Sequence, residues 1–157
     1  MHTVVLVGAR HRGWKRSVDN MAIIKGVLEE RRKQLGEHAH ELNVASMSCD
    51  AGFGKDLRVY CEEEGVKFCE FVVYFNGPRD RAEYNRAYRA RHAALVDIGD
   101  EFFIAVLNSR KSTVEDLVER VRDSGKTYVL YDDTNNIIEY RDALREAESS
   151  KADEQQA

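Results

Sequence analysis

Runs of consecutive apolar residues alternate along the chain with segments in which apolar residues recur every three or four positions. Runs of the first kind are typical of strands buried on both faces, and segments of the second kind are typical of amphipathic helices. The predicted strands are 3–9, 41–47, 66–75, 101–107 and 127–132. The predicted helices are 18–35, with Ser17 as the N-cap, 56–65, 79–98, 112–125 and about 136–147.

Strands that alternate with helices at this spacing predict βαβ crossovers. We therefore expect an α/β fold, with a Rossmann-like open parallel sheet of five strands and helices on both faces. Residues 1–147 are predicted to form a single domain, and the polar residues 148–157 a disordered tail. Ligands of such sheets bind beyond the carboxyl ends of the strands. The candidate ligand loops are 8–17, 48–56, 76–80, 108–113 and 132–135.

Composition narrows the class of ligand. The chain has 157 residues and a net charge of −4, so it has no general attraction for nucleic acid or anionic membranes, and an anion site must be local. No apolar run is long enough to span a membrane, and the first residues do not read as a signal peptide. The odd number of cysteines and the absence of a CxxC pair indicate free thiols in a reducing compartment. We expect a cytoplasmic protein.

The loop "GARHRGWK" at 8–15 has the glycine spacing of a phosphate-binding P-loop. A P-loop also needs a lysine directly after its second glycine, and here Trp14 intervenes, which argues against nucleoside triphosphate hydrolysis. The cationic loop still suits a monophosphate or an acidic ligand, with Gly8, Arg10 and Arg12 as predicted ligand-binding residues. A solvated basic loop explains the same residues equally well.

The loop "SCDAGFGKD" at 48–56 follows the second predicted strand. Gly52 and Gly54 permit a close backbone approach, and a helix that begins near Lys55 would direct free N–H groups at an anion. Asp50 is suited to hydrogen-bond a ribose or to act as a general acid or base. The alternative is a tight turn between strand and helix.

Two further groups of residues have reactive or metal-binding side chains. Cys49 is a candidate nucleophile, but a packed thiol is the favoured interpretation because no histidine is placed beside it. His38 and His40 lack a third ligand nearby, and protein zinc sites use three or four. We expect neither a metal nor a cofactor.

The predicted helix 79–98 is rich in arginine and carries tyrosines at helical spacing. Tyr84, Tyr88, Arg91 and Leu95 form one stripe, with His92 beside it. An arginine on an otherwise apolar stripe calls for a carboxylate or phosphate partner. A solvent-exposed charged face is the simpler explanation for Arg79, Arg81 and Arg86. Interleaved tyrosine and arginine would also suit single-stranded nucleic acid.

The loop "SRKST" at 109–113 leads from the fourth predicted strand into a helix. Its predicted ligand-binding residues are Arg110, Lys111, Ser112 and Thr113. Either hydroxyl residue can cap the helix, and Glu115 and Asp116 in the first turn complement the helix dipole. Capping accounts for those residues but leaves the two cations at the ligand edge unexplained.

Two stretches together resemble the SLOG superfamily, the Rossmann-like group of the lonely-guy phosphoribohydrolases and DNA-processing protein A. "YRARHAAL" at 88–95 resembles the motif M-H-x-R-K, with Arg91 on the arginine. "NSRKSTVEDL" at 108–117 resembles P-G-G-x-G-T-x-x-E, with Thr113 on the threonine and Asp116 on the glutamate. "VGAR" and "AGFGKD" are similar to the YspA-like branch. The proline and glycines of the second motif are replaced by Asn108, Ser109, Arg110 and Ser112.

The resemblance implies a homodimer that cleaves the N-glycosidic bond of a nucleoside 5′-monophosphate. Asp116, with Glu115 as its substitute, would stabilise the cationic ribose, and Arg91 would hold the phosphate or neutralise the departing group. The lost glycines favour retained binding over catalysis, so a catalytically silent nucleotide sensor or sequestering protein is an alternative. A single-stranded nucleic-acid-binding protein is the weaker third hypothesis.

Overall fold

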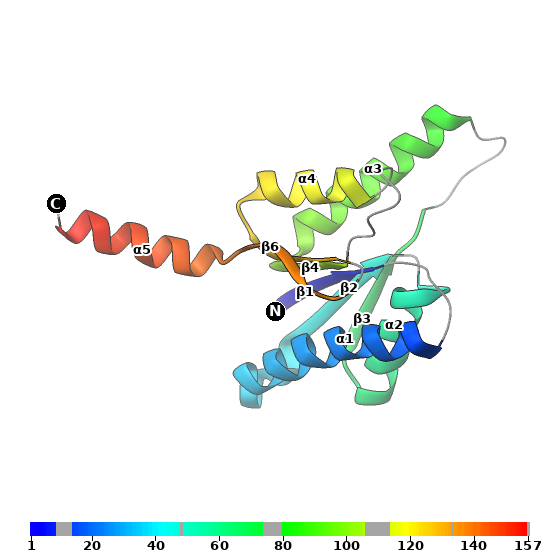
Figure 1. The fold of residues 1–157 in the computed structure, drawn as a ribbon, viewed down its shortest axis with the longest axis horizontal. Coiled ribbons are helices and arrows are strands. Elements are labelled where there is room, and N and C mark those ends of the chain that lie inside the picture. Colours follow the sequence, from blue (N-terminus) through cyan, green and yellow to red (C-terminus); the bar gives the residue numbers. More distant parts are fainter. Residues whose placement is uncertain (9–13, 48, 74–79, 106–113, 133, 157) are drawn as a thin grey trace.

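A six-stranded sheet with the strand order β3-β2-β1-β4-β5-β6 forms the centre of the molecule (Figure 1). The computed structural model describes residues 1–8, 14–47, 49–73, 80–105, 114–132 and 134–156. The strands are β1 (His2–Val7), β2 (Leu42–Met47), β3 (Lys67–Phe71), β4 (Glu101–Ala105), β5 (Thr127–Tyr131) and β6 (Ile137–Arg141). The first five strands are parallel to one another, and β6 pairs antiparallel with β5.

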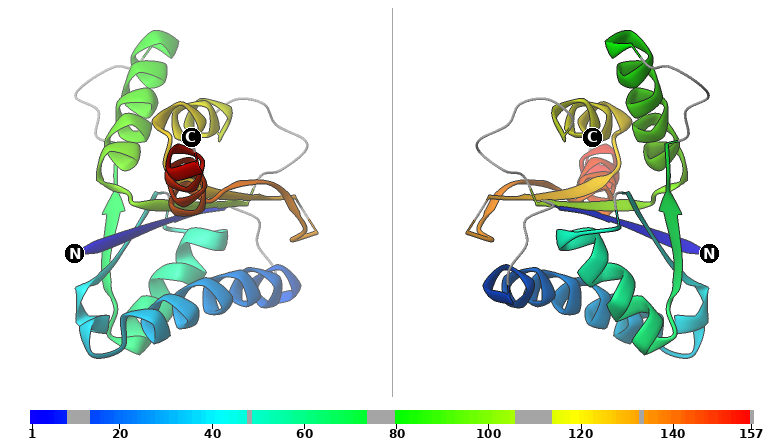
Figure 2. Two further views of the ribbon diagram at one scale, coloured as in Figure 1. Left: turned by 90° about the vertical axis from the view of Figure 1, so that its left-hand side faces the viewer. Right: turned by 90° about the vertical axis from the view of Figure 1, so that its right-hand side faces the viewer.

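Helices cover both faces of this sheet (Figures 1 and 2). They are α1 (Trp14–Leu35), the short 3-10 helix η1 (Gly36–Glu41), α2 (Gly52–Glu64), α3 (Arg81–Ile98), α4 (Val114–Ser124) and α5 (Ala143–Gln156). α1 and α2 lie on one face, α3 and α4 lie on the other, and α5 extends away from the sheet. Within the described ranges, no helix is both long and apolar enough to cross a membrane.

Alternate residues of the central strands face the two helical layers, which gives the protein two hydrophobic cores. Val4 and Leu6 of β1 face α1 and α2, and Val5 and Val7 face α3 and α4. Both sets are fully or almost fully buried, which explains the unbroken apolar run that predicts this strand. The predicted α/β fold, with a parallel sheet between helices, is therefore confirmed, but the predicted number of five strands is wrong, because β6 adds a sixth, antiparallel strand.

The predicted helix over 136–147 is wrong in its first half, where the chain forms β6. A tight turn precedes this strand: Asp132 Oδ1 accepts hydrogen bonds from the backbone amides of Thr134 and Asn136, both at 2.9 Å. Asn135 adopts a φ of 63° in that turn. The turn reverses the chain, so that backbone pairing with β5 replaces the helical hydrogen bonds.

Several element boundaries also differ from the prediction. α1 begins at Trp14, before the predicted cap Ser17, and α2 begins at Gly52. α5 continues to Gln156, where the sequence predicts a disordered tail; this segment is rich in alanine, glutamate and other strong helix formers. The predicted helices 56–65 and 112–125 both end on a glycine in the sequence, and Gly65 and Gly125 follow α2 and α4 with left-handed φ values of 66° and 73°.

Candidate functional site at the carboxyl edge

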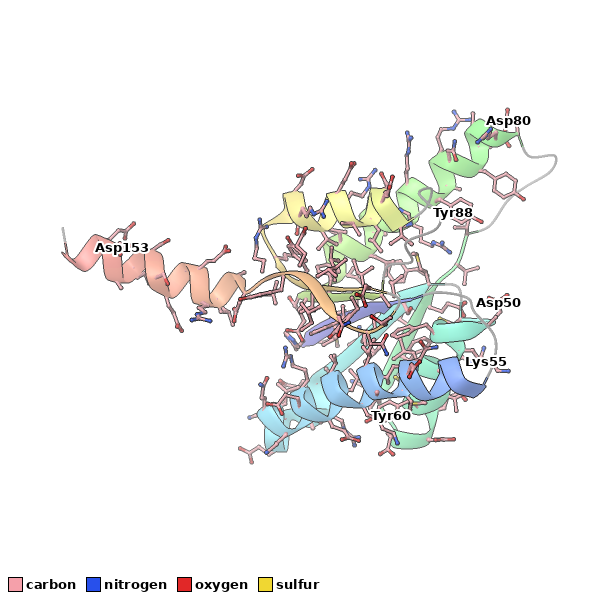
Figure 3. All side chains as sticks on the ribbon, in the orientation of Figure 1. Asp50, Lys55, Tyr60, Asp80, Tyr88 and Asp153 are labelled. Carbon is pink, nitrogen blue, oxygen red and sulfur yellow. The ribbon has the colours of Figure 1, made fainter. Side chains whose placement is uncertain are left out.

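The strand order reverses direction between β1 and β4, which lie side by side at the centre of the sheet. The helix after β1 lies on one face, and the helix after β4 lies on the other. Ligands of open α/β sheets bind in the crevice beyond the carboxyl ends of the strands at such a reversal. Figure 3 shows Asp50, Lys55 and Tyr88 at this end of the molecule, and Asp153 of α5 at the opposite end.

Gly8, the first residue after β1, is in close contact with α2. A Cβ atom added to Gly8 would lie 2.3 Å from Cγ of Phe53, and the Phe53 ring is buried. The glycine therefore allows the end of β1 to pack directly against the first turn of α2. Its predicted role in ligand binding stays a prediction, whereas this packing role follows from the geometry.

The start of α2 keeps several features of the predicted anion loop. Gly52 adopts a φ of 62°, which suits glycine, and the N-cap residue Ala51 offers no side-chain hydrogen bond to the helix. Asp50 and Lys55 are exposed, whereas Gly54 is buried with the core. An exposed lysine therefore lies beside a helix N-terminus whose N-cap residue, Ala51, makes no side-chain cap.

Cys49 is unsuited to the role of nucleophile. Its side chain is fully buried, and burial raises the pKa of its thiol to about 12. The pKa of the buried Cys61 is raised to about 12 by the same cause. Because the thiolate is the reactive form, both cysteines act as packing residues, as the favoured interpretation of Cys49 predicts.

The tyrosines and one arginine of the α3 stripe stack on each other. The Tyr84 and Tyr88 rings lie 6.1 Å apart with an interplanar angle of 17°, and the Arg91 guanidinium carbon lies 5.0 Å from the Tyr88 ring centroid. Arg81, Arg86 and Arg89 are exposed. The sequence-based interpretation of an exposed charged face is confirmed for Arg81 and Arg86, and Arg79 lies outside the described residues. Arg91 belongs to the stripe.

A buried histidine connects α3 to α4. His92 is 1% exposed, and its Nδ1 lies 2.8 Å from Oδ2 of Asp116. The same oxygen accepts a hydrogen bond of 2.9 Å from Nε of Arg120. An ionised carboxylate can only accept, so Nδ1 of His92 carries the hydrogen. Nε2 of His92 is buried and has no hydrogen-bond partner among the described residues.

The pKa shifts agree with that protonation pattern. Burial lowers the pKa of His92, and the hydrogen bond to Asp116 only partly opposes this effect. Burial would raise the pKa of Asp116, but the hydrogen bonds from His92 and Arg120 outweigh it, so that the pKa of this carboxyl is lowered. At neutral pH the cluster therefore contains a neutral imidazole, an ionised carboxylate and a guanidinium.

Several predicted site residues are thus brought to the same edge of the sheet. Arg91 is adjacent to His92, which touches Asp116, and Glu115 is exposed in the same turn of α4. Arg10, Arg12, Arg110, Lys111, Ser112 and Thr113 lie outside the described residues. Sequence reasoning missed the contributions of His92 and Arg120, although the spacing from Asp116 to Arg120 is that of an ion pair within a helix.

No metal site is found in the part of the chain that the structure describes, where no group of three or more His, Cys, Asp or Glu side chains could hold an ion. His38 is exposed, and its ring lies 6.3 Å from that of His40. Two surface hollows contain none of the predicted ligand-binding or catalytic residues, although Asn135 of the candidate loop 132–135 lines the first of them. One, of about 400 Å³, lies between α1 and the sheet beside Phe103 and Tyr131, and the other, of about 340 Å³, lies near Glu101.

The fold defines the class of protein as a doubly wound, mostly parallel α/β protein. No family model and no curated protein matches the chain. Among solved structures, it is similar to a protein from Burkholderia multivorans that is described as a putative short-chain alcohol dehydrogenase. The two share 13% sequence identity at a TM-score of 0.38, over 95% of this chain and 72% of that one.

Proposed function

We propose that the carboxyl edge of the sheet binds a nucleotide or a related phosphorylated small molecule, in a Rossmann-like domain of the SLOG type. The observation that supports this best is the 2.8 Å contact between His92 and Asp116. These residues belong to the two stretches that resemble SLOG motifs, and a shared site requires those stretches to meet. The start of α2, where the N-cap residue Ala51 makes no side-chain hydrogen bond, would supply a further group of anion-binding N–H donors.

The charges suit the two ends of such a ligand. Arg91 offers a guanidinium, whose planar donors match the oxygens of a phosphate. Asp116 offers an ionised carboxylate, and its side chain is 28% exposed, so that a ligand can reach it. Arg91 on α3 and Asp116 on α4 would together orient such a ligand. The cation would contact its phosphate, and the anion would contact a polar or electron-poor sugar at the other end.

Hydrolysis of the N-glycosidic bond is the finer form of this proposal. The bond between C1′ and the base breaks with its electron pair leaving on the base, and water adds to C1′ to give ribose 5-phosphate and the protonated base. Asp116 would stabilise the positive charge that develops on the ribose and would align the water, with Glu115 as the substitute carboxylate. Arg91 would hold the phosphate throughout.

Binding without turnover is the second candidate, and a specific contact favours it. Nε of Arg120 lies 2.9 Å from Oδ2 of Asp116, so a permanent cation already offsets the carboxylate charge that a ribosyl cation would need. A paired carboxylate stabilises a transient cation less than an unpaired one. The same pocket would then serve a sensor or sequestering protein.

Nucleotide incubation separates the two candidates. The protein is mixed with AMP and, separately, with dCMP, and free base is measured by chromatography while binding is followed by thermal shift. Base release that Asp116→Asn abolishes supports the hydrolase. A thermal shift without base release supports the silent binder. No shift and no release with any common nucleotide contradicts both.

Arg91→Ala locates the pocket. We expect this variant to lose nucleotide binding, whereas Arg89→Ala should retain it, because Arg89 is an exposed arginine on the same helix, two residues away. Binding that survives Arg91→Ala unchanged would show that the ligand lies elsewhere.

A further inference from the structure

The two edges of the sheet expose different kinds of side chain. β3 and β6 are the edge strands, and each pairs with a single neighbour among the described residues (Figure 2). The exposed residues of β3 are Lys67, Cys69 and Glu70. The exposed residues of β6 are Ile137, Ile138 and Tyr140. Proteins commonly protect an exposed edge strand with charged side chains, and the exposed positions of β6 carry none.

The helix that follows β6 is exposed as well. Every residue of α5 from Leu144 to Glu154 is exposed, and the helix extends away from the sheet (Figure 1). An isolated helix of 14 residues is only marginally stable in water. The first turn of α5 adds the exposed Leu144 to the apolar residues of the neighbouring strand. We call Ile137, Ile138, Tyr140 and Leu144 the β6–α5 surface.

The side chains of β6 alternate between the two faces of the sheet. The β5 partner of Tyr140 packs on the core beneath α1, so Tyr140 and Ile138 face the α1 side. Glu139 and Arg141 face the α4 side. There, Glu139 accepts hydrogen bonds of 2.7 and 2.8 Å from the guanidinium of Arg122, and Arg141 donates one of 2.8 Å to the carbonyl oxygen of Arg122. The edge therefore has an apolar pair on one face and an acid and a base on the other.

These charges select one way for β6 to pair with a copy of itself. Two identical strands pair antiparallel about a two-fold axis that passes through one residue. With the axis at Tyr140, the two rings are opposite each other, and Glu139 of each copy is opposite Arg141 of the other, which are favourable cross-strand pairs. With the axis at Glu139, two carboxylates would be directly opposite, which is unfavourable. With the axis at Ile138, neither charge faces an opposite charge.

We propose that β6 pairs with β6 of a second copy of the chain, so that the two sheets join across a two-fold axis at Tyr140. The outward N–H and C=O groups of both edge strands then gain hydrogen-bond partners. In this register Ala143 of one copy is opposite Ile137 of the other, which brings the first turn of α5 beside the exposed isoleucines. The inference is independent of the proposed function, because β6 and α5 carry no residue of the proposed ligand site.

Sedimentation equilibrium of the full chain tests for the second copy. The wild type should have a mass of twice 18.0 kDa. Tyr140→Lys should weaken the dimer roughly five- to thirtyfold, because it replaces an aromatic pair by two opposed cations. The Tyr140 side chain is 67% exposed, so this variant should keep the circular dichroism spectrum of the wild type. Val72→Lys, at an exposed apolar residue that follows β3, is the matched control and should leave the dimer unchanged.

Engineered cysteines test the register. The background is Cys69→Ser, because Cys69 is exposed whereas Cys49 and Cys61 are buried. Tyr140→Cys places two thiols directly opposite each other on the axis, within reach of a disulfide, so mild oxidation should link the two copies. Ile138→Cys is the control. Its two thiols would lie four residues apart along the strands, about 13 Å, which is too far for a disulfide.

The outcomes decide both the partner and the register. A chain that is monomeric at every concentration overturns the inference. A dimer that Tyr140→Lys leaves intact also overturns it, because the copies would then meet at another surface. Oxidative linkage through Ile138→Cys instead of Tyr140→Cys overturns the axis at Tyr140 and the charge pairing on which the proposal rests.

Discussion

The two ends of the sheet each carry an acidic residue paired with a histidine and an arginine, but the buried member differs. At the amino edge Glu101 is 6% exposed and is paired with Arg31, and Nε2 of His2 lies 3.6 Å from it. At the carboxyl edge the histidine is the deep member: His92 is 1% exposed, whereas the side chain of Asp116 is 28% exposed.

This difference separates a stabilising cluster from a cluster that a ligand can reach. At the amino edge the cation covers the carboxylate, and the long arginine side chain also lies over the Phe103 ring at 5.8 Å. At the carboxyl edge the imidazole is shielded, and the carboxylate contacts solvent at the end where open α/β sheets bind ligands. Under the proposed function, similar residue types would therefore serve two purposes, depending on which member of the cluster is buried.

Removal of each carboxylate is the strongest test of the comparison. Glu101→Ala leaves Arg31 without its carboxylate partner and should lower the free energy of unfolding by about 3 kcal/mol. This value is the lower end of the range for a broken buried ion pair. Asp116→Ala leaves one buried N–H of His92 unpaired and should cost about 1 to 2 kcal/mol. Urea unfolding at neutral pH measures both.

For nucleotide binding the order of the two effects should be the reverse, with the larger loss in Asp116→Ala and the smaller in Glu101→Ala. The Glu101 variant, measured well below its unfolding transition, should bind AMP as the wild type does. The Asp116 variant should bind AMP more weakly or lose base release. If both variants change ligand binding equally, the two clusters do not differ in function, and the comparison fails.

At each edge, an aromatic ring packs so closely against a glycine that there is no room for a larger side chain there. A Cβ atom at Gly8 would lie 2.3 Å from Phe53, and one at Gly99 would lie 2.6 Å from Phe102. Gly8→Ala and Gly99→Ala should each lower the free energy of unfolding by about 2 kcal/mol, because a packed ring must move. Thermal unfolding measures this loss.

Only the first of these glycines should affect the ligand. Gly8→Ala displaces Phe53 at the start of α2, beside Gly52, Gly54 and Lys55, whereas Gly99 follows α3 at the amino edge. We expect weaker AMP binding in Gly8→Ala and unchanged binding in Gly99→Ala. Equal binding in both would mean that the start of α2 takes no part in the site.

Most of the fold can be predicted from local patterns. The apolar run of β1 identifies a strand because both its faces are covered, and Gly65 and Gly125 mark helix ends because the left-handed region favours glycine. β6 was missed because its residues also fit a helical period. The usable signal was the preceding "DDTNN", whose Asp and Asn side chains favour a turn over helix initiation.

The candidate site is less visible in the sequence, because its contacts join distant positions. Arg91 and Asp116 could be selected from motifs, but the partner of Asp116 is His92, 24 residues away, and only the packing of α3 on α4 brings them together. Tyr88 and Arg91 are three residues apart on one helix, so their stacking follows from helical geometry.

Lys126 provides a smaller test at the amino edge. Its Nζ donates to the carbonyl oxygens of Val96 at 2.7 Å, Gly99 at 2.8 Å and Asp97 at 3.2 Å, all at the C-terminal end of α3. Lys126→Met should lower the free energy of unfolding by about 1 kcal/mol, because these carbonyls lose a charged donor. The lysine is far from the proposed pocket, so AMP affinity should not change.

The pH dependence of stability is the smallest expected effect, because Asp116 partly opposes the burial that lowers the pKa of His92. A folded-state pKa below the ordinary 6.5 means that the unfolded chain binds the proton more readily. The contribution of His92 to stability is therefore complete above pH 6.5 and decreases as the pH falls below it. Protonation would also place a hydrogen on Nε2, which has no acceptor among the described residues.

The loss of stability that His92 causes should occur at a pH well above the range in which the carboxyl group of Asp116 titrates. The pKa of Asp116 is lowered from 3.8, so its own contribution persists until the solution is more acidic than that. The positive charges of Arg91 and Arg120 also lower the pKa of His92, because they disfavour a positive charge on the imidazole. Urea unfolding at about pH 7.5 and about pH 5.5 should show a smaller difference for His92→Asn than for the wild type, because asparagine can still donate to Asp116 but does not titrate. An unchanged difference would place the titrating group elsewhere, and the buried histidine would then no longer distinguish the carboxyl edge from the amino edge.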